Sequence, residues 1–416
     1  MRSLELFSGA GGLAKGLELA GFKHSAFVEF NKHACSSLAV NFEPDKVFFG
    51  DIKDFDLNSV GVVDIVAGGP PCQPFSLGGK HQANQDNRDM FPFAIQAVEE
   101  LTPKAFVFEN VKGLLRPSFA DYFEYIILRL TYPSFTAKSD MAWEEHLVHL
   151  QKVDKFHYDG IKYDVNFKLI NAADYGVPQT RERVVIVGIR SDIGESWSFP
   201  EATHSEDRLI WDMHVTSDYW KRHNVEESCR PPVADSMRKK ATRLRNRFGF
   251  LEPDLQPWRT VRDALQGVPD PNEKHDIKDH VFKKGARIYP GHTGSDFDWP
   301  SKTIKAGAHG VPGGENMIRF SDGSVRYLST FEAKRIQTFP DSFIIKGAWS
   351  EAMRQLGNAV PVLLAEIIGN KLREMLNHAL TSTQSHVNLD SSKNRQSIPS
   401  TRSGFTVDQI THKKAA

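Results

Sequence analysis

The chain has 416 residues, of which 52 are basic and 52 are acidic, so its formal net charge is zero. This length allows two or three domains of about 100–200 residues each. Its three cysteines are too few for a disulfide framework, no Cys-x-x-Cys pair suggests a zinc site, and no apolar run is long enough to span a membrane. The zero net charge argues against a histone-like or polybasic binder but does not exclude a nucleic-acid partner, and the other features exclude a disulfide framework and a membrane-spanning segment. We expect a cytoplasmic protein without a bound metal.

The first half of the chain alternates short apolar runs with helical patterns. Strands are predicted at 4–7, 25–28, 47–49, 62–67 and 105–108, and helices at 12–20 and 93–101. Later strands are predicted at 165–171 and 183–190, and the connection between them is too short for a helix, so this pair is expected to be antiparallel. The alternation predicts an α/β fold with a mostly parallel, twisted sheet and helices on both faces.

The rest of the chain divides into three parts. Residues 195–328 lose the apolar rhythm and predict a smaller, loop-rich domain, after a first domain at 1–194. Residues 329–380 are helical again and are expected to return to the first domain, with Asn358 as the cap of the last helix. Residues 381–416 contain 12 serines and threonines and are expected to be a disordered tail.

Charge is distributed unevenly. Residues 191–230 contain 4 basic and 9 acidic side chains, whereas residues 231–310 contain 15 basic and 10 acidic ones. The densest basic run, 238–247, includes Arg243 and Arg245. Such a run is either the solvated face of a helix or a surface that contacts phosphates, and both interpretations stay open.

In open α/β sheets, ligands bind at the carboxyl ends of the strands. Glycines follow the first predicted strand (Gly9, Gly11, Gly12), Glu29 follows the second, and Asp51 and Ile52 follow the third. Glycines allow close approach of the backbone, and an acid here can hold ribose hydroxyls. The set predicts a cofactor that contains adenosine. The glycine spacing also fits a nicotinamide or flavin enzyme.

Reactive side chains follow the next two strands. Cys72 lies in a stretch stiffened by Pro70, Pro71 and Pro74, as a fixed nucleophile requires. Glu109 follows the run Ala-Phe-Val-Phe, where burial is expected to raise the pKa of its carboxyl and let it donate a proton.

The start of the last predicted strand carries three alternating polar side chains. Gln179, Arg181 and Arg183 are expected to share one face of the chain. Two guanidinium groups on one face indicate an anion, either a phosphate or a thiolate.

In this order, these residues resemble the cytosine-C5 DNA methyltransferases that use S-adenosylmethionine. The matching blocks are Phe7-Ser-Gly-Ala-Gly-Gly12, Glu29, Gly50-Asp-Ile52, Pro70-Pro-Cys-Gln73, Glu109-Asn-Val111, Gln179-Thr-Arg-Glu-Arg183, Arg335-Ile-Gln-Thr-Phe-Pro340 and Gln355-Leu-Gly-Asn-Ala-Val-Pro361. The resemblance extends over about residues 4–365. It implies a Rossmann-like methyltransferase fold with a target-recognition domain, residues 195–328, across a DNA-binding cleft.

The resemblance also implies roles for single residues. Cys72 would attack C6 of a flipped cytosine, Glu109 would protonate N3, and Arg183 would hold the nucleotide, with Arg181 and Gln179 orienting the same loop. The positions that would bind S-adenosylmethionine are Phe7, Gly9, Gly11, Gly12, Glu29, Asp51, Ile52, Pro71 and Asn358.

Candidate contacts to double-stranded DNA are Ser76, Arg243, Arg245, Thr303 and Lys305. The expected form is a monomer, and a restriction endonuclease that acts independently is a possible partner.

The chain departs from the family at two places. Residues 133–160 are an apparent insertion, within which 141–153 predicts a short amphipathic helix, and Phe331 replaces a usual arginine. Three rival hypotheses remain at this stage: the same chemistry on tRNA, a nicotinamide oxidoreductase, and a DNA-binding protein that has lost activity.

Overall fold

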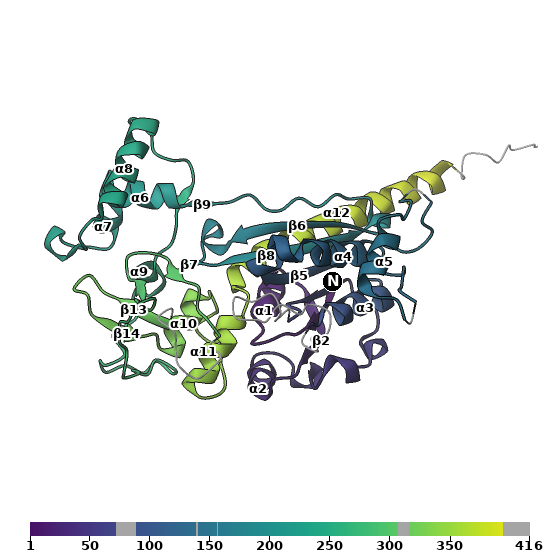
Figure 1. Cartoon of the computed structure of the whole chain (residues 1–416), viewed down its shortest axis with the longest axis horizontal. Coiled ribbons are helices and arrows are strands. Elements are labelled where there is room, and N and C mark those ends of the chain that lie inside the picture. Colours follow the sequence, from purple (N-terminus) through teal and green to yellow (C-terminus); the bar gives the residue numbers. More distant parts are fainter. Residues whose placement is uncertain (72–88, 139, 156, 307–315, 394–416) are drawn as a thin grey trace, which may run out of the picture.

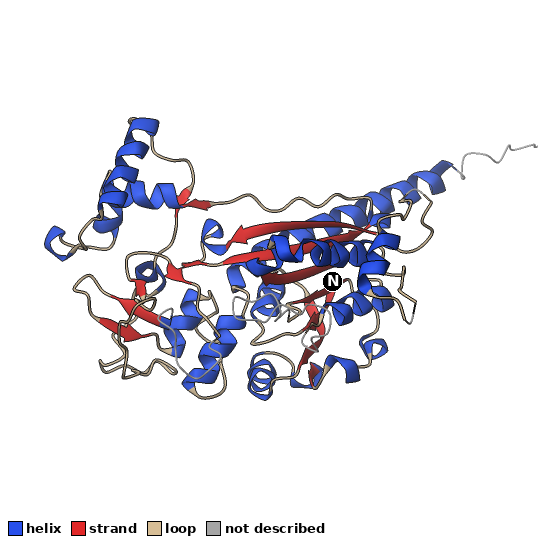
Figure 2. Ribbon diagram, in the orientation of Figure 1, coloured by secondary structure: helices blue, strands red, loops and turns tan. Residues whose placement is uncertain are grey.

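The computed structural model describes residues 1–71, 89–138, 140–155, 157–306 and 316–393. Its centre is a seven-stranded sheet with the order β3-β2-β1-β4-β5-β8-β6 (Figure 2). The strands are β1 (Arg2–Leu6), β2 (Lys23–Glu29), β3 (Val47–Phe49), β4 (Ile65–Gly68), β5 (Ala105–Val111), β6 (Tyr163–Asn171) and β8 (Glu182–Arg190). Strand β8 runs antiparallel to both β5 and β6, and the other pairs are parallel. The predicted sheet and its antiparallel pair are confirmed.

Helices cover both faces of this sheet, as predicted (Figure 1). One face packs against α3 (Phe91–Leu101) and α4 (Ala120–Thr131), and the other against α1 (Gly12–Leu19) and α12 (Val362–Lys393). Helix α2 (Lys32–Asn41), which was not predicted, follows β2. Because both faces are buried, the strands are nearly continuous apolar runs.

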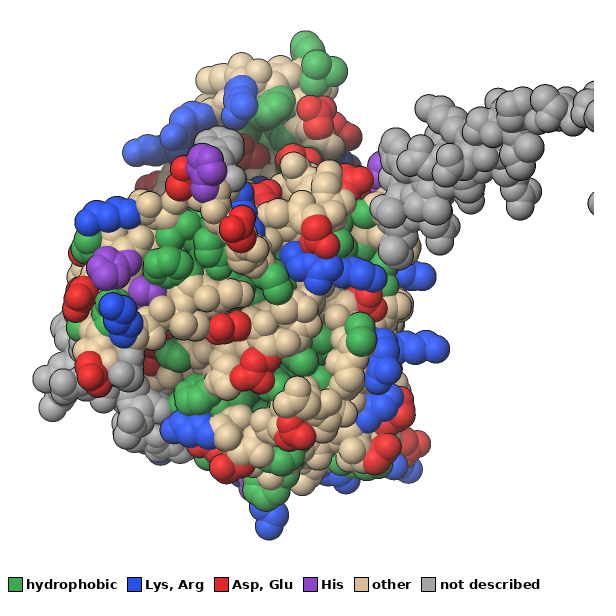
Figure 3. Space-filling model, turned by 90° about the vertical axis from the view of Figure 1, so that its right-hand side faces the viewer, with side chains coloured by type: hydrophobic (Ala, Val, Ile, Leu, Met, Phe, Trp, Pro, Cys, Tyr) green, Lys and Arg blue, Asp and Glu red, His purple; other side chains and the backbone are tan. Residues whose placement is uncertain are grey.

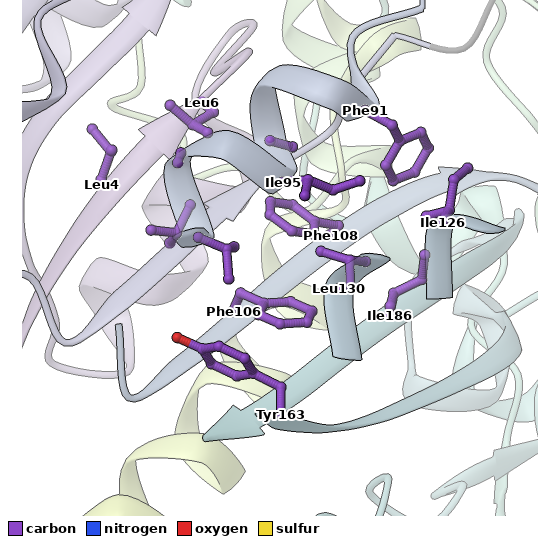
Figure 4. Close-up of a cluster of buried hydrophobic side chains, with 14 of the residues drawn as sticks. Leu4, Leu6, Phe91, Ile95, Phe106, Phe108, Ile126, Leu130, Tyr163 and Ile186 are labelled. Atoms are coloured by element: carbon purple, nitrogen blue, oxygen red, sulfur yellow. The ribbon is translucent and has the colours of Figure 1, made fainter. Parts of the chain in front are cut away.

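Alternate residues of each strand enter different cores. Leu4 and Leu6 of β1 and Phe106 and Phe108 of β5 point toward α3 and α4 (Figure 4), whereas Val107 packs toward α1 and α12. Phe106 and Phe108 stack with their ring centroids 5.2 Å apart. This packing fixes the register of β5, and therefore the direction in which Glu109 leaves the sheet.

The insertion at 133–160 contains α5 (Trp143–Leu150), so the short helix predicted there is confirmed. Helix α5 packs on α4, where the rings of Trp143 and Tyr122 lie 5.1 Å apart at nearly a right angle. The hydroxyl of Tyr122 also donates a hydrogen bond to Asp89. The insertion therefore braces the outer side of α4.

The region 195–328 has more helix than its sequence predicted. It contains α6 (Glu206–His214), α7 (Asp218–Arg222), α8 (Asp235–Phe248) and α9 (Val261–Ala264). In Figure 1, α6, α7 and α8 form a lobe at one corner of the molecule. The basic run lies in α8, whose apolar side chains Met237, Ala241, Leu244 and Phe248 recur at intervals of three and four residues and pack toward α6. This short stretch of helical apolar spacing was not recognised in the sequence.

Short strands complete this region. Strand β9 (His204–Ser205) pairs with β10 (Gln256–Pro257), and β11 (Ser295–Asp296), β13 (Met317–Arg319) and β14 (Val325–Tyr327) form a three-stranded set. Strand β12 (Ser301–Lys302) pairs with β7 (Gln179–Thr180), which precedes the region in the sequence.

Helices α10 (Thr330–Ile336) and α11 (Trp349–Asn358) share one core with α9, Ile304 and Ile318. They therefore pack with the region 195–328, and α12 is the element after residue 329 that packs along the main sheet. The boundary predicted at 328 and 329 falls inside this core.

The C-terminal part corrects two expectations. Asn358 does not cap the last helix, because it is the final residue of α11 and α12 begins at Val362. Helix α12 also continues to Lys393, so residues 381–393 are helical and not disordered; residues 394–416 lie outside the described residues. No helix in the described part of the chain is long and apolar enough to cross a membrane.

Candidate active site

The loop between β1 and α1 places three glycines in different surroundings. A Cβ atom on Gly12 would lie 2.2 Å from the carbonyl oxygen of Val360, and one on Gly11 would meet Leu38 and Phe42 at under 3 Å. At Gly9, apart from its two chain neighbours, no described residue places an atom within 4 Å of such a Cβ, and its φ of +54° favours glycine. Because Gly11 and Gly12 have no side chain, neighbouring groups can pack closely against their backbone. The backbone at Gly9 is instead accessible to a ligand.

Glu29, the last residue of β2, lies beside this loop. Its Oε2 accepts a hydrogen bond from the backbone N–H of Gly9 at 2.7 Å. Its Oε1 accepts from the N–H groups of Phe30 at 3.1 Å and Asn31 at 2.7 Å. Three backbone donors thus fix the carboxylate between the carboxyl ends of β1 and β2.

Asp51 and Ile52 follow β3, which is paired with β2. Asp51 is exposed and accepts a hydrogen bond from the N–H of Lys53 at 3.1 Å, while Ile52 is half-buried. Phe30 also lies here with 75 % of its surface exposed. Phe30 was not among the predicted site residues, but an exposed aromatic ring directly after Glu29 offers a surface that can stack on a flat ring.

Cys72 and Ser76 lie outside the described residues. The chain on both sides of them is anchored: Asn110 Nδ2 donates to the carbonyl of Pro70 at 3.0 Å, and Met90 N donates to the carbonyl of the exposed Pro71 at 3.1 Å. The sequence placed Asn110 in a motif without assigning it a role. Its side chain links the end of β5 to the residues that precede Cys72.

Cys35, which lies in helix α2 after strand β2, is a poor nucleophile. Burial, reinforced by the negative charge of Glu29, raises the pKa of the Cys35 thiol to about 12. Its Sγ donates to the carbonyl of Glu29 at 3.2 Å. Cys35 therefore remains a protonated, structural thiol.

Glu109 and Arg183 form a close ion pair at the carboxyl end of β5. The Nε of Arg183 lies 2.8 Å from Oε1 of Glu109, and only 13 % and 10 % of the two side chains are exposed. The N–H of Arg183 does not point at that oxygen, which accepts no hydrogen bond from the described residues. Glu109 Oε2 faces Gly69. The carboxyl group is thus held next to the segment that carries Cys72.

Arg181 and Gln179 are fully buried beside this pair. Burial, with the nearby charge of Arg183, lowers the pKa of Arg181 well below its usual value, and Glu109 opposes this shift. Nε and Nη1 of Arg181 and Nε2 of Gln179 have no acceptor among the described residues. Buried donors are rarely left unpaired, so this cluster is suited to an oxygen-rich or anionic ligand.

Strand β12 attaches the region 195–328 to this cluster. The N–H of Ile304 donates to Oε1 of Gln179 at 3.2 Å, and Thr303 Oγ1 donates to the carbonyl of Thr180 at 2.8 Å. The hydroxyl of Thr303 is thereby engaged with the backbone of β7. Lys305 is exposed just beyond it.

Other predicted residues lie apart from the cluster. Asn358 is exposed at the end of α11, next to the segment whose Val360 carbonyl covers Gly12. Arg243 and Arg245 are exposed on α8 in the outlying lobe. Phe331, which stands where the family often has arginine, is buried against the ring of His280. Its neighbour Glu332 forms an ion pair with Arg326, with 2.6 Å between Nη2 of the arginine and Oε1 of the glutamate.

Two further features concern the site and its surroundings. An open pocket of about 450 Å³ is lined by residues that include Pro178, Arg259, Asp263, Arg335 and Phe339. The described part of the chain contains no group of three or more His, Cys, Asp or Glu side chains that could hold a metal ion.

Comparisons with known proteins agree with this geometry. The family model described as "C-5 cytosine-specific DNA methylase" matches residues 1–141 and 141–374. The chain is 32 % identical over 387 residues to the Type II methyltransferase M.PspPI of Psychrobacter sp., covering 90 % of this chain and 80 % of that protein. It is 29 % identical to M.NgoMIV of Neisseria gonorrhoeae, covering 90 % and 97 %.

Solved structures show the same fold. A putative DNA modification methyltransferase encoded in an E. coli prophage aligns with a TM-score of 0.54 and 20 % identity, over 91 % of this chain and 99 % of that one. The Dnmt2 methyltransferase of S. pombe aligns with a TM-score of 0.52 and 16 % identity, over 91 % and 98 %.

Proposed function

The chain belongs to the C-5 cytosine-specific DNA methylases, and we propose that it methylates a flipped cytosine through a covalent adduct on Cys72. At the coarser level it is a DNA cytosine-C5 methyltransferase of the Type II restriction-modification kind. The rival hypothesis of a nicotinamide oxidoreductase is thereby wrong.

The residues around Gly9 fit an adenosine-containing methyl donor. Open space at Gly9 would admit the ligand, Glu29 would hold ribose hydroxyls, and Asp51 with Ile52 and Phe30 would contact the adenine. Phe7, Gly11, Gly12, Pro71 and Asn358 complete the proposed site. When bound, S-adenosylmethionine supplies an electrophilic methyl group on its sulfonium.

The target cytosine must leave the base stack, because its reacting atoms are inaccessible inside the duplex. The thiolate of Cys72 would attack C6, while Glu109 donates a proton to N3, so that C5 becomes nucleophilic and accepts the methyl group. Loss of the C5 proton to solvent, expulsion of Cys72 as the thiolate and return of the N3 proton to Glu109 would then give 5-methylcytosine and restore the starting protein.

Arg183 would hold Glu109 and the flipped nucleotide, and the buried donors of Arg181 and Gln179 would bind the acceptor atoms that arrive with it. The observation that carries this proposal is the cluster of buried donors next to the Glu109–Arg183 pair that have no acceptor among the described residues. In the apolar interior, an incoming oxygen or thiolate would satisfy them at little cost.

The experiment is methyl transfer from labelled S-adenosylmethionine to duplex DNA and, separately, to tRNA. We expect DNA to be labelled and tRNA not, and 5-fluorocytosine DNA to trap the protein covalently. Cys72→Ser should abolish trapping, and Cys229→Ser, at an exposed thiol in another region, is the matched control. Full turnover by Cys72→Ser would overturn the nucleophile assignment.

We further propose that residues 195–328, together with α10 and α11, form the target-recognition domain. Ser76, Arg243, Arg245, Thr303 and Lys305 remain proposed DNA contacts. We expect the enzyme to act as a monomer, with any cognate restriction endonuclease acting independently.

A further inference from the structure

One exposed loop of the recognition region carries positive charge only. This basic loop, residues 281–294, contains Lys283, Lys284 and Arg287 and no aspartate or glutamate. All three side chains are exposed, and none forms an ion pair with a residue that the structure describes. The ammonium of Lys283 lies 5.6 Å from the ring centroid of Trp349.

The basic loop is anchored at both ends. His280, which precedes it, is fully buried, and its two ring nitrogens contact Ser329 Oγ and the carbonyl of Pro269, each at 2.8 Å. Ser295, which follows it, is buried and its Oγ accepts from the N–H of Lys302 at 3.0 Å. The three cations are thus presented on a defined piece of backbone.

A turn inside the loop adds to this order. Tyr289 and His292 exchange two backbone hydrogen bonds of 2.8 and 3.2 Å, and Gly291 between them has a φ of +82°. A loop that is ordered before binding loses less conformational entropy when it binds.

The basic loop is also connected to the active site. Lys302 Nζ donates to Thr293 Oγ1 at 2.8 Å, and Lys302 belongs to β12. Strand β12 pairs with β7, in which Gln179 lies opposite Ser301. One strand therefore separates the loop from the cluster of unpaired donors.

Other basic surfaces of the molecule are partly neutralised. On α8, Lys240 pairs with Glu206 at 2.7 Å, and Arg247 lies 4.0 Å from Asp207. The face in Figure 3, at the end of the molecule away from the recognition region, mixes basic and acidic side chains. The three cations of the basic loop have no acidic partner among the described residues, so their charge is available to attract a polyanion.

We propose that the basic loop contacts the phosphates of duplex DNA beside the target cytosine. This inference rests on the proposed function and adds a contact surface that the motifs do not identify. Each phosphate neutralised by a cation releases counterions, so three contacts contribute about 2–3 to the slope of log K against log salt.

The test compares K283A/K284A/R287A with the matched control K23A/K152A/K162A. In the control, Lys23 starts β2 and Lys162 precedes β6, so both lie at the ends of the strands opposite the candidate active site, and Lys152 follows α5. Binding to a duplex that the wild-type enzyme methylates, with S-adenosylhomocysteine present, is measured over a salt series from about 50 to 200 mM. Circular dichroism and thermal unfolding verify that each variant is folded.

We expect the loop variant to lose about 2–3 from the salt slope and the control to match the wild type. A loop variant that is folded and keeps the wild-type slope overturns the inference, as does an equal loss in the control. If the loop variant does not fold, K283Q/K284Q with R287Q replaces it, and the same two outcomes apply. Failure of the wild type to methylate any duplex would instead overturn the proposed function.

Discussion

Arg183 Nε lies 2.8 Å from Glu109 Oε1, although the two residues are 74 positions apart in the sequence. The antiparallel pairing of β5 and β8 puts Val111 opposite Arg183 and Glu109 opposite Val185. Glu109 and Arg183 are therefore diagonal neighbours on one face of the sheet, within reach of long side chains. The register of the sheet therefore brings the Glu109 carboxyl group and the Arg183 guanidinium group together.

The contact between Glu109 and Arg183 predicts that the losses of stability caused by substituting the two residues are not additive. Arg183→Met should destabilise the protein by about 3–5 kcal/mol, because it leaves the Glu109 carboxylate buried without its partner. The double variant Glu109→Gln/Arg183→Met should cost clearly less than the sum of the two single variants. Urea unfolding of all four proteins measures this, and strictly additive values would show that the two side chains are not coupled.

Glu109→Gln tests the proposed proton donor. We expect the rate of methyl transfer to fall by about 10²-fold or more, the usual contribution of a general acid. The affinity for S-adenosylhomocysteine should stay the same, since Glu109 lies away from Gly9 and Glu29. A variant with an unchanged single-turnover rate would contradict the role.

Gly9→Ala tests the open space above the glycine loop. The positive φ strains an alanine by about 1–2 kcal/mol, and the new methyl group would enter the region proposed for the cofactor. We expect the affinity for S-adenosylhomocysteine, measured by calorimetry, to fall at least about tenfold, a loss of about 1.4 kcal/mol.

Gly194→Ala is the matched control for Gly9→Ala. Gly194 has φ 73° and ψ 9°, and no described residue beyond its chain neighbours places an atom within 4 Å of a Cβ there, but this glycine lies after β8. The control should show a similar loss of stability and normal cofactor affinity. Equal cofactor affinity in both variants would mean that Gly9 does not face the ligand.

Asn110→Asp tests the anchor before Cys72. The replacement puts an oxygen next to the carbonyl of Pro70 in place of the donor and keeps the acceptor for the N–H of Val111. Because small displacements of a nucleophile are costly, we expect kcat to fall about 10²-fold with cofactor affinity preserved. Asn58→Asp, on an exposed turn, is the control. A fall in cofactor affinity equal to that in kcat would indicate a general loss of structure.

The environment of Asp263 predicts that the stability of the proposed recognition region decreases at low pH. Burial alone would raise the pKa of this carboxyl, but hydrogen bonds from His223 and Thr260 outweigh it and hold the pKa below the usual value. A depressed pKa means that the carboxylate stabilises the fold above about pH 4 and that this contribution is lost as the pH falls through the folded pKa.

Asp263→Asn should therefore lower stability at pH 7 and flatten its decline between about pH 5 and 3. Tryptophan fluorescence during urea unfolding reports it, since Trp220 and Trp258 pack in this region. Asp254→Asn, at an exposed position, should leave the pH profile unchanged. An equally steep decline in Asp263→Asn would refute the assignment.

The sequence by itself determined the sheet, its antiparallel pair and the order of the chemical motifs. Apolar runs, glycines at Gly9 and Gly11, and the acids Glu29 and Glu109 are local signals, because they report burial and strand ends within a few residues. Helices α6 and α7 escaped prediction because they span only 9 and 5 residues, and α8 because only Ala241 and Leu244 of its side chains are buried, so the apolar pattern of each is short.

Only the tertiary structure decided which distant residues meet. The pairing of Gln179 with Ser301, the bond from Asn110 to Pro70 and the shared core of α10 and α11 with Ile304 join parts of the chain far apart in sequence. Hydrogen bonds and packing at such separations leave no local pattern, because they depend on how the elements dock. That docking buries Arg181 with donors that find no acceptor among the described residues, and it anchors the basic loop one strand from the candidate active site.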